Sequence, residues 1–479
     1  MANRDFSIVI LAAGKSTRFK SEHSKLVHML AGRPLGDYVV SAALAAAPET
    51  LLMVVGHNAA EVRETLARPG LRFVVQKEQR GTGHALMIAR PQLEKCRSSA
   101  VVVVVGDAPL LRTETLLDLV LFHRKTRAAA SILTMKPPSP TGYGRIVRSG
   151  GRNVRAIVEE KLCTPAQRKI SEVSSGILCF SRADLLKHLD ELSDKNPQKE
   201  YLLTDLVKIL NRHRKKVVTF PVADAREVLG VNDRVELAQI ERVLRLQKAE
   251  ALMLDGVTIV DPNTAYIDAG VEVGNDTVIE PGVSLLGDTR IGCGCTIRVH
   301  STIEDSILGD RVQVRPNTCV TGCEIGSDVV LGPFARLRDG AVIDPGARIG
   351  NFVEVKKSHV GQGTKAWHLT YLGDANLGKQ VNVGAGTVTC NYDGEKKNPT
   401  NIEDGLFVGS GSMLVAPVKI GKGAYVAAGS TITEDVPPES LAVGRARQVN
   451  KTDWVRKHKE LKSQFASKPG SDANGNGPE

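Results

Sequence analysis

Aliphatic residues recur at every sixth position through much of the second half of this 479-residue chain. Three runs share the spacing: Val273, Ile279, Leu285, Ile291, Ile297 and Ile303; Ile325, Leu331, Leu337, Ile343, Ile349 and Val355; and Val408, Leu414, Ile420, Val426 and Ile432. Small residues, often glycine, commonly follow the aliphatic one. A repeat sustained over so many units predicts a parallel β-helix of hexapeptides, in which each coil buries its aliphatic row against the next coil.

The period is lost between His359 and Leu406. Polar and aromatic residues gather there: Trp367, His368, Tyr371, Asn382, Asn391, Tyr392, Lys396 and Lys397. Because a solenoid needs no such cluster to be stable, this segment is predicted to hold a functional site.

The first half of the chain has a different pattern. Apolar segments alternate with amphipathic segments of helical length from residue 5 to about 228, and the expected strands are 7–12, 51–55, 72–75, 100–105 and 129–135. This alternation predicts a mostly parallel, doubly wound α/β sheet. In such sheets ligands bind beyond the carboxyl ends of the strands.

Between the two halves, segment 233–253 has apolar residues at helical spacing among charges and predicts a connecting helix. The residues from about Ser467 are rich in Gly, Asn, Ser and Pro and are predicted to be disordered. We therefore divide the chain into a sheet domain (1–231), a linker helix (232–253), a β-helix domain (254–466) and a tail (467–479).

Composition narrows the classes of partner. The net charge is +10, but no zinc-finger spacing or aromatic-basic platform accompanies it, so we expect no nucleic-acid partner. The longest apolar runs, such as 8–13 and 100–105, are too short to span a bilayer, so we expect no membrane insertion. Eight scattered cysteines without the spacing of a disulfide scaffold indicate a cytoplasmic enzyme.

A loop after the first expected strand suits phosphate binding. Leu11-Ala12-Ala13-Gly14 ends in glycine, which lets backbone N–H groups approach a phosphate, and Arg18 and Lys25 supply positive charge. The loop matches neither the dinucleotide nor the Walker motif, and by itself it is equally compatible with a structural turn.

Two further loops follow expected strands. Gln76 and segment 81–84 (Gly-Thr-Gly-His) suit a close approach to a base or sugar. Asp107 ends the apolar run 100–105, where its carboxylate either holds a hard cation or caps the following helix.

The order of motifs then resembles a known family. LAAGxxTR…K, QxxxxGTGHA, GDxPL, GYGRI, IVEEK and GVNDR occur as in sugar-1-phosphate nucleotidyltransferases, and NFVEVKKS, HLTYLGD and NVGAGTVTCNYDG look like acetyltransferase signatures. Together they resemble the bacterial bifunctional N-acetylglucosamine-1-phosphate uridyltransferase/glucosamine-1-phosphate acetyltransferases over about residues 6 to 448. The resemblance implies that the β-helix is left-handed, an exception to the usual crossover rule.

The resemblance also implies two reactions of UDP-N-acetylglucosamine synthesis. Acetyl-CoA would acetylate glucosamine-1-phosphate, and the product would attack UTP and release pyrophosphate, supplying precursors of peptidoglycan and lipopolysaccharide. Mg²⁺ would assist the second reaction. Because the family's acetyl-transfer sites lie between subunits, a homotrimer is implied.

Site residues follow from the same resemblance. The UDP-N-acetylglucosamine site would comprise Leu11, Ala12, Ala13, Gly14, Lys25, Gln76, Gly81, Thr82, Gly106, Asp107, Gly144, Glu159, Ser174 and Asn232. Asp107 and Asn232 would bind Mg²⁺, while Lys25 and Arg18 neutralise phosphate charge.

In the C-terminal half, His368 would be the general base of acetyl transfer. The amino-sugar phosphate would be bound by Arg338, Lys356, Tyr371, Asn382 and Lys397. The groove for acetyl-CoA would comprise Ala385, Asn391, Tyr392, Ser410, Ala428 and Arg445.

Four residues depart from the family pattern. Ser16 stands where glycine is usual, Ser24 where proline precedes the lysine, Val105 where tyrosine is common, and Ser174 where an asparagine contacts the sugar. The departure at Ser174 is expected to weaken sugar binding modestly, since a hydroxyl offers one donor where a carboxamide offers two.

Two alternative functions fit the sequence less well. In one, the β-helix only oligomerises a single-function nucleotidyltransferase, as in ADP-glucose synthesis, but a plain solenoid would not carry His368, Tyr371, Asn391 and Tyr392 in its break. In the other, the chain is a non-catalytic scaffold, but the joint presence of Lys25, Asp107, Glu159 and Asn232 argues against a decayed site.

Overall fold

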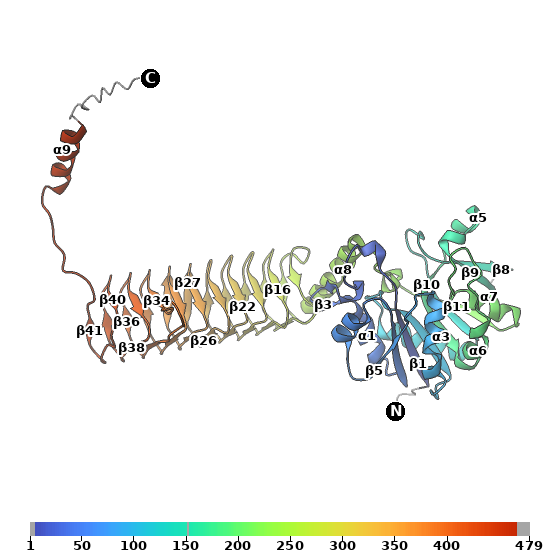
Figure 1. Ribbon diagram of the computed structural model, residues 1–479. Coiled ribbons are helices and arrows are strands. Elements are labelled where there is room, and N and C mark those ends of the chain that lie inside the picture. Colours follow the sequence, from blue (N-terminus) through green and yellow to red (C-terminus); the bar gives the residue numbers. More distant parts are fainter. Residues whose placement is uncertain (1–4, 151–152, 467–479) are drawn as a thin grey trace, which may run out of the picture. The chain divides into compact units, whose positions relative to one another are not determined.

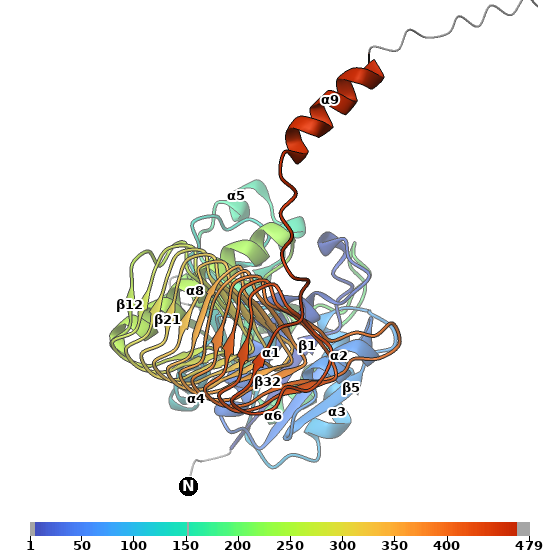
Figure 2. The same ribbon diagram turned by 90° about the vertical axis from the view of Figure 1, so that its left-hand side faces the viewer.

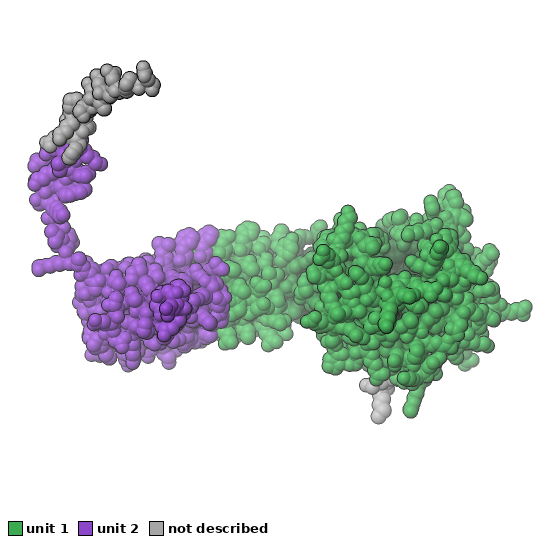
Figure 3. All heavy atoms as spheres, viewed as in Figure 1, with its two compact units in different colours: residues 1–333 green, residues 334–479 purple. Residues whose placement is uncertain are grey.

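The computed structural model describes residues 5–150 and 153–466. The chain forms two compact units, Met1–Pro333 and Phe334–Glu479, coloured separately in Figure 3. Their boundary falls inside the β-helix, so the sequence-based division at the linker helix stays a prediction. The tail expected at 467–479 lies outside the described residues.

The first unit contains a twisted sheet with the strand order β11-β7-β10-β6-β1-β4-β5 (Figure 1). Its strands are β1 (Phe6–Ala12), β4 (Thr50–Val55), β5 (Leu71–Val75), β6 (Ala100–Val105), β7 (Ala130–Met135), β10 (Val173–Ser181) and β11 (Val217–Pro221). All neighbours on this path are parallel except β10, which is antiparallel to β6 and β7. A hairpin of β8 (Arg145–Ser149) and β9 (Asn153–Val158) extends from β10, and β2 (Met29–Leu30) pairs with β3 (Arg33–Pro34).

Both faces of this sheet are covered. Successive residues of β1 point to opposite faces, so Ile8 and Ile10 belong to one apolar core and Val9 to the other. The helices are α1 (Leu35–Ala45), α2 (Ala59–Leu66), α3 (Thr82–Leu93), α4 (Thr113–Thr126), α5 (Pro165–Arg168), α6 (Arg182–His188) and α7 (Asp205–Arg212), with short 3₁₀ turns η1 (Thr17–Phe19), η2 (Lys25–Val27), η3 (Glu160–Leu162), η4 (Leu189–Glu191) and η5 (Ala225–Val228). The predicted doubly wound fold is confirmed.

The helix α8 (Arg234–Leu254) follows the sheet, close to the expected 233–253. Asp233 caps it by accepting N–H groups of Val235 and Glu236. Arg245 on α8 lies 3.4 Å from the Asp268 carboxylate, and the next residue along, Ala269, donates its N–H to Ala31. The start of the β-helix is therefore held against both α8 and the sheet domain.

The β-helix is three-sided, because its strands form three parallel ladders in which a strand pairs with the third strand after it, except that β39 pairs with β41; Figure 2 views the coils nearly end-on. The first unit contains β12 (Thr258–Ile259), β13 (Tyr266–Ile267), β14 (Glu272–Val273), β15 (Val278–Ile279), β16 (Ser284–Leu286), β17 (Arg290–Ile291), β18 (Thr296–Ile297), β19 (Thr302–Glu304), β20 (Ile307–Leu308), β21 (Gln313–Val314), β22 (Cys319–Thr321), β23 (Glu324–Ile325) and β24 (Val330–Leu331). Its pairings place Ile259, Ile279 and Ile297 in one buried row.

The second unit continues the same architecture. Its strands are β25 (Arg336–Arg338), β26 (Val342–Ile343), β27 (Arg348–Asn351), β28 (Glu354–Lys356), β29 (His359–Val360), β30 (Lys365–His368), β31 (Tyr371–Gly373), β32 (Ala375–Leu377), β33 (Asn382–Val383), β34 (Val388–Cys390), β35 (Thr400–Ile402), β36 (Phe407–Val408), β37 (Met413–Val415), β38 (Val418–Ile420), β39 (Tyr425–Val426), β40 (Thr431–Ile432) and β41 (Leu441–Ala442), followed by α9 (Trp454–Ala466). The predicted hexapeptide fold is confirmed, and it is consistent with left-handed coiling.

The predicted break in the repeat is wrong for most of its length. The coils continue from β29 through β34, and the inward positions step by five residues between Val355 and Val360 and between Leu372 and Leu377. Only segment 391–399 leaves the coil, between β34 and β35. A five-residue step shortens one corner without removing the buried row. A search for aliphatic residues at every sixth position therefore misses the coils that contain such a step.

Among the described residues, none of the helices combines the length and the apolar character needed to cross a bilayer.

Candidate active sites

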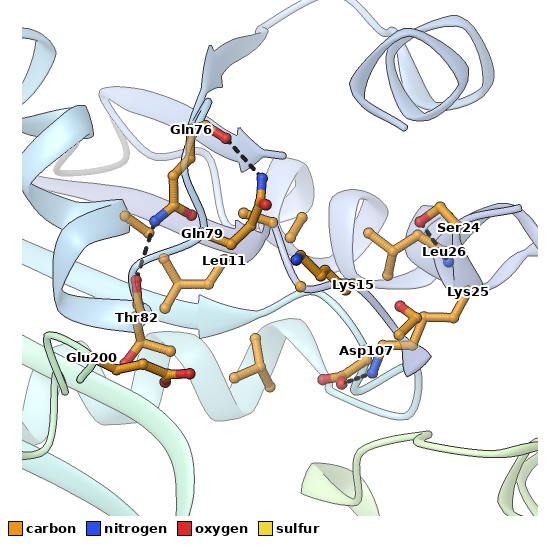
Figure 4. A pocket seen from close by; sticks show the side chains of 17 residues that line it. Leu11, Lys15, Ser24, Lys25, Leu26, Gln76, Gln79, Thr82, Asp107 and Glu200 are labelled. Atoms are coloured by element: carbon orange, nitrogen blue, oxygen red, sulfur yellow. Dashed lines mark hydrogen bonds and ion pairs between the residues drawn. The ribbon is translucent and has the colours of Figure 1, made fainter. Parts of the chain in front are cut away.

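A cavity of about 500 Å³ opens at the carboxyl ends of β1, β5 and β6. It is lined by Leu11, Ala12, Ala13, Gly14, Lys15, Ser16, Ser24, Lys25, Leu26, Gln76, Gln79, Gly81, Thr82, Ala85, Val105, Asp107 and Glu200 (Figure 4). Nine residues expected at the nucleotide site are among them: Leu11, Ala12, Ala13, Gly14, Lys25, Gln76, Gly81, Thr82 and Asp107. The three loops singled out in the sequence therefore meet at one cavity.

Two polar pairs lie at one end of the cavity, Lys25 with Asp107 and Arg18 with Asn232. Lys25 forms an ion pair with Asp107, and its Nζ also donates to the backbone oxygen of Val231 at 2.9 Å. The next residue, Asn232, accepts a hydrogen bond from Arg18 at 2.8 Å through its Oδ1. All four expected charge-handling residues, Arg18, Lys25, Asp107 and Asn232, thus belong to one hydrogen-bonded region.

This region fits a hard cation. The Asp107 carboxylate and the Asn232 carboxamide oxygen are the ligand types that Mg²⁺ prefers. Both are partly exposed, and the backbone N–H of Val231 donates to the backbone oxygen of Asp107 at 2.9 Å, which fixes the two segments side by side. Lys25 now neutralises Asp107, and a cation there would release its ammonium for phosphate.

A second group comprises Gly144, Glu159, Ser174 and Thr204. Thr204 donates to Oε1 of Glu159 at 2.9 Å, and the backbone N–H of Ser174 donates to Gly144 at 2.8 Å. Burial raises the pKa of Glu159, against the opposing effect of the Thr204 hydrogen bond. The hydroxyl of Ser174 is buried and accepts the N–H of Gly176 at 3.2 Å.

None of these three predicted sugar-contacting residues, Gly144, Glu159 and Ser174, is among the residues that line the described cavity. Tyr143 directly precedes Gly144 and also lies near Asp107 of the cation region. Burial raises the pKa of Tyr143, and the nearby charges of Glu236 and Asp107 raise it further. Gly106 is buried and donates its N–H to Leu11 at 2.9 Å, so it joins β6 to the phosphate loop.

Sequence reasoning missed several lining residues, among them Lys15, Gln79 and Glu200. Gln79 donates to the backbone oxygen of Gln76 at 3.1 Å, and Glu200 precedes Tyr201, whose oxygen accepts the N–H of Gly83 at 2.7 Å. This pairing joins distant parts of the chain and leaves no local signal. It explains Gly81, which has φ +104° and where a Cβ would lie 2.6 Å from the Tyr201 oxygen.

In the second unit, three cationic side chains gather on one face of the β-helix. Arg338 and Lys356 are register partners on β25 and β28, and the ammonium of Lys356 lies close to that of Lys397. This close approach of Lys397 lowers the pKa of Lys356, and the positive charge of Arg338 acts in the same direction. Two carboxylates partly balance this positive charge, because Arg338 pairs with Asp339 and Glu354 at 2.8 Å each.

His368 stands at a corner of the coil with one ring nitrogen engaged. Its Nδ1 lies 2.8 Å from Oδ1 of Asn351 in the preceding coil. Because a carboxamide oxygen only accepts, this contact assigns the proton to Nδ1 and leaves the Nε2 lone pair of the exposed ring available.

Three of the residues predicted to bind acetyl-CoA, Ala385, Ser410 and Ala428, lie at the same corner as His368. The ladders pair Ala366 with Val383, Val383 with Val408, and Val408 with Val426. Continuing each by two residues stacks His368, Ala385, Ser410 and Ala428 in one column. Backbone hydrogen bonds from Gly411 to Ala385 and from Gly429 to Ser410 hold this column, and a Cβ at Gly429 would lie 3.8 Å from Cδ of Arg445.

The remaining predicted residues lie nearby but differ in setting. Asn391 is buried and donates to Asp374 at 2.5 Å, whereas Tyr392 is exposed in the loop after β34. Tyr371 lies on the same face as Lys356, and Asn382 on the preceding face. Within one chain, Asn391 thus supports the loop instead of lining the column.

Comparisons with known proteins agree with this geometry. The model for the MobA-like NTP transferase domain matches residues 8–206, and that for bacterial transferase hexapeptides (six repeats) matches 322–357 and 399–434. The chain is 50% identical to the bifunctional protein GlmU of Koribacter versatilis, covering 95% of this chain and 97% of that protein. It is 48% identical to the GlmU proteins of Trichlorobacter lovleyi and Carboxydothermus hydrogenoformans, each covering 94% of this chain and 98% and 99% of the relative. This chain belongs to the GlmU family of bifunctional uridyltransferases and acetyltransferases.

Proposed function

We propose that the two reactions of this UDP-N-acetylglucosamine-synthesising enzyme take place at the cavity beyond β1, β5 and β6 and at the His368 corner of the β-helix. UTP and acetyl-CoA are the respective activated substrates. Uridyl transfer is assigned to residues 1–231 and acetyl transfer to residues 254–466.

At the first site, the nucleotide is held by the loop 11–14 and by Gln76, Gly81 and Thr82. Gly144, Glu159 and Ser174 hold the sugar. Lys25 and Arg18 bind the phosphates and neutralise their charge. The phosphate oxygen of N-acetylglucosamine-1-phosphate is thereby aligned for in-line attack on the α-phosphorus of UTP. The bond to pyrophosphate breaks as the new P–O bond forms.

Mg²⁺ is proposed to be held by Asp107 and Asn232. The ion would neutralise charge on the phosphate oxygens during transfer. The oxygen ligands and their fixed backbone pairing support this assignment.

At the second site, the phosphate of glucosamine-1-phosphate is bound by Arg338, Lys356 and Lys397, with Tyr371 and Asn382 contacting the sugar. His368 Nε2 removes a proton from the substrate ammonium. The free amine attacks the thioester carbonyl carbon, the second N–H proton passes to the sulfur, and the C–S bond breaks to release CoA as the thiol. The observation that supports this assignment is the hydrogen bond from Nδ1 to Asn351, because it leaves Nε2 as the base.

A homotrimer is also proposed. Tyr392 and Arg445 are exposed in one chain, and a neighbouring subunit would complete the groove at the column that begins with His368. A cytoplasmic location is proposed because both activated substrates are intracellular metabolites.

Two variants test the assignment of the sites. His368→Ala should lower release of CoA thiol from acetyl-CoA and glucosamine-1-phosphate by about 10²–10⁴-fold but not release of pyrophosphate, whereas Asp107→Ala should impair only release of pyrophosphate. If either variant lost both activities while remaining folded, the two sites would not be separate as proposed.

Mixed trimers test whether subunits share the acetyl-transfer site. His368→Ala and Tyr392→Ala chains, each inactive alone, should regain partial acetyl transfer when they are unfolded, mixed and refolded together. Mixed assemblies that stay inactive would place both residues in a site formed by a single chain.

A further inference from the structure

Three side chains able to bind a metal meet outside both proposed sites. His188 ends α6, Glu191 ends the following turn η4, and His213 directly follows α7. One ligand atom from each lies within 4.8 Å of the others. The first two are three residues apart, while His213 comes from a separate helix that packs on α6.

The contacts among them converge on one carboxylate. His188 Nδ1 lies 2.6 Å from Oε1 of Glu191, and His213 Nε2 lies 2.9 Å from the same oxygen and 3.0 Å from Oε2. The two imidazole rings contact each other in a tilted arrangement, with their centroids 4.3 Å apart and their planes at 35°. The ring nitrogens and the carboxylate therefore already face a common point.

The three side chains differ in how far they are buried. The His188 ring is 2% exposed and its Nε2 has no hydrogen-bond partner, whereas Glu191 and His213 are exposed. The Glu191 carboxylate is held between the two imidazoles by the contacts to His188 and His213 and remains open to solvent. One ligand is fixed by packing, and two can adjust from the solvent side.

We propose that His188, Glu191 and His213 form a binding site for a divalent transition-metal ion such as Zn²⁺. Two imidazoles and one carboxylate form a common zinc ligand set, with water in the fourth position. Ligand distances of about 2.0–2.2 Å in a tetrahedron separate the ligand atoms by roughly 3.4 Å. The two separations between Glu191 and the histidines, 2.6 and 2.9 Å, would have to lengthen by less than about 1 Å to reach this value, exchanging N–H···O hydrogen bonds for coordination.

The bound ion ties the end of α7 to α6 and η4. The other end of α7 follows Thr204, which holds Glu159, and Leu203, whose N–H donates to Thr82 at 3.1 Å. Zn²⁺ binding therefore stabilises the wall of the uridyl-transfer cavity without contacting substrate. This site has two imidazole ligands, whereas the proposed Mg²⁺ site has only oxygen ligands. Since imidazole favours Zn²⁺ over Mg²⁺, the two sites are expected to select different ions.

The test is equilibrium binding of Zn²⁺ and Co²⁺ to the metal-free full-length chain in excess Mg²⁺. We expect one tight ion per chain, a Co²⁺ absorption band typical of tetrahedral nitrogen and oxygen ligation, and a higher Tm with Zn²⁺. His213→Asn and Glu191→Gln change exposed residues and should keep the fold, and each should weaken Zn²⁺ binding at least about 10-fold.

His359→Asn is the matched control. His359 also pairs with a carboxylate, Asp344, at 3.0 Å, and its side chain is 46% exposed against 45% for His213, but that pair is not among the three-ligand groups found in the described residues. This variant should retain the tight ion and the Tm increase. Equal Zn²⁺ affinity in all variants, or no saturable binding to the unmodified chain, would reduce the cluster to a hydrogen-bonded His–Glu–His group and overturn the proposal.

Discussion

His368 shows how a single hydrogen bond assigns a chemical role. With Nδ1 held by Asn351, only Nε2 can accept a proton. His368→Ala should lower kcat for acetyl transfer by about 10²–10⁴-fold and leave uridyl transfer unchanged. Asn351→Ala should cause a smaller loss and alter the pH profile of kcat, because the ring loses its fixed tautomer. An unchanged rate of CoA release by His368→Ala would show that the ring only packs at the corner.

Glu159 is expected to make sugar binding depend on pH. Burial raises its pKa above the ordinary 4.5, so it takes up a proton at a higher pH than an exposed glutamate does. The KM for N-acetylglucosamine-1-phosphate should therefore rise as the pH falls through this raised pKa. Glu159→Gln should raise KM at neutral pH and remove the dependence.

The raised pKa of Glu159 also makes the free energy of unfolding depend on pH. The dependence has the opposite sign to that of a salt-bridged carboxylate, whose pKa is lowered. Because the folded state holds the proton more tightly than the unfolded state, the free energy of unfolding falls as pH rises through the raised pKa. Thermal melts of Glu159→Gln should then show a Tm gain at pH 8 that shrinks at pH 4. A variant with no pH-dependent difference would mean that Glu159 titrates as an exposed residue.

Ser174 gives a prediction of increased affinity. Its hydroxyl already accepts the N–H of Gly176 at 3.2 Å. In Ser174→Asn, the carboxamide oxygen can keep that bond while its NH₂ group donates to the sugar. The KM for the sugar phosphate should fall by the equivalent of one hydrogen bond, about 0.5–1.5 kcal/mol, with little change in kcat. Loss of activity, or no change in any constant, would remove Ser174 from the sugar site.

Local motifs predicted residues that contact ligands through their own loop. The segment 11–14 spans the end of β1, Lys25 begins η2 further along the same connection, and Asp107 follows β6; all of them line one cavity. Lys15 belongs to the same loop and could have been included. Glu200 could not, because it reaches the cavity only through the pairing of Tyr201 with Gly83, which depends on the tertiary fold.

At the scale of elements, hydrophobic spacing predicted most of the fold. The expected strand 100–105 coincides with β6, and the helix expected at 233–253 is α8, displaced by one residue at each end. The antiparallel direction of β10 was not predicted, because an apolar strand buried on both faces carries no signal of direction. The five-residue steps of the β-helix were missed for a similar reason, since burial depends on the corner and not on a fixed count.

The N-terminal cap of α8 connects helix stability with the cation region. Asp233 accepts N–H groups of Val235 and Glu236, both at 2.9 Å, and it directly follows Asn232. Asp233→Ala should lower the free energy of unfolding by about 0.5–2 kcal/mol and raise the Mg²⁺ concentration needed for half-maximal uridyl transfer. Glu250→Ala, on an exposed position of the same helix, should change neither quantity beyond a few tenths of a kcal/mol. An unchanged Mg²⁺ requirement in Asp233→Ala would separate the cap from the cation region.

For the molecule as a whole, the sequence predicted two kinds of core but not how far the first extends. Contacts group residues up to Pro333 with the sheet domain. The Ala269–Ala31 hydrogen bond and the approach of Arg245 to Asp268 account for part of this, and neither involves a recognisable motif. Packing of this kind is specified by shape, which periodicity does not encode.

A chain that ends after Leu254 tests whether uridyl transfer is independent of the β-helix. The lining of the cavity comes from residues 11 to 200, and the proposed cation ligand Asn232 precedes α8, so this fragment should retain Mg²⁺-dependent release of pyrophosphate within a few-fold of the full-length chain. It should release no CoA, because His368 and the column below it are missing. It should also unfold at a lower temperature, since it lacks the Asp268 partner of Arg245 and the Ala269 partner of Ala31. Asp268→Asn in the full-length chain should reproduce part of that loss. If the fragment is folded by circular dichroism and yet inactive with UTP and N-acetylglucosamine-1-phosphate, the β-helix contributes directly to uridyl transfer and the proposed domain assignment fails.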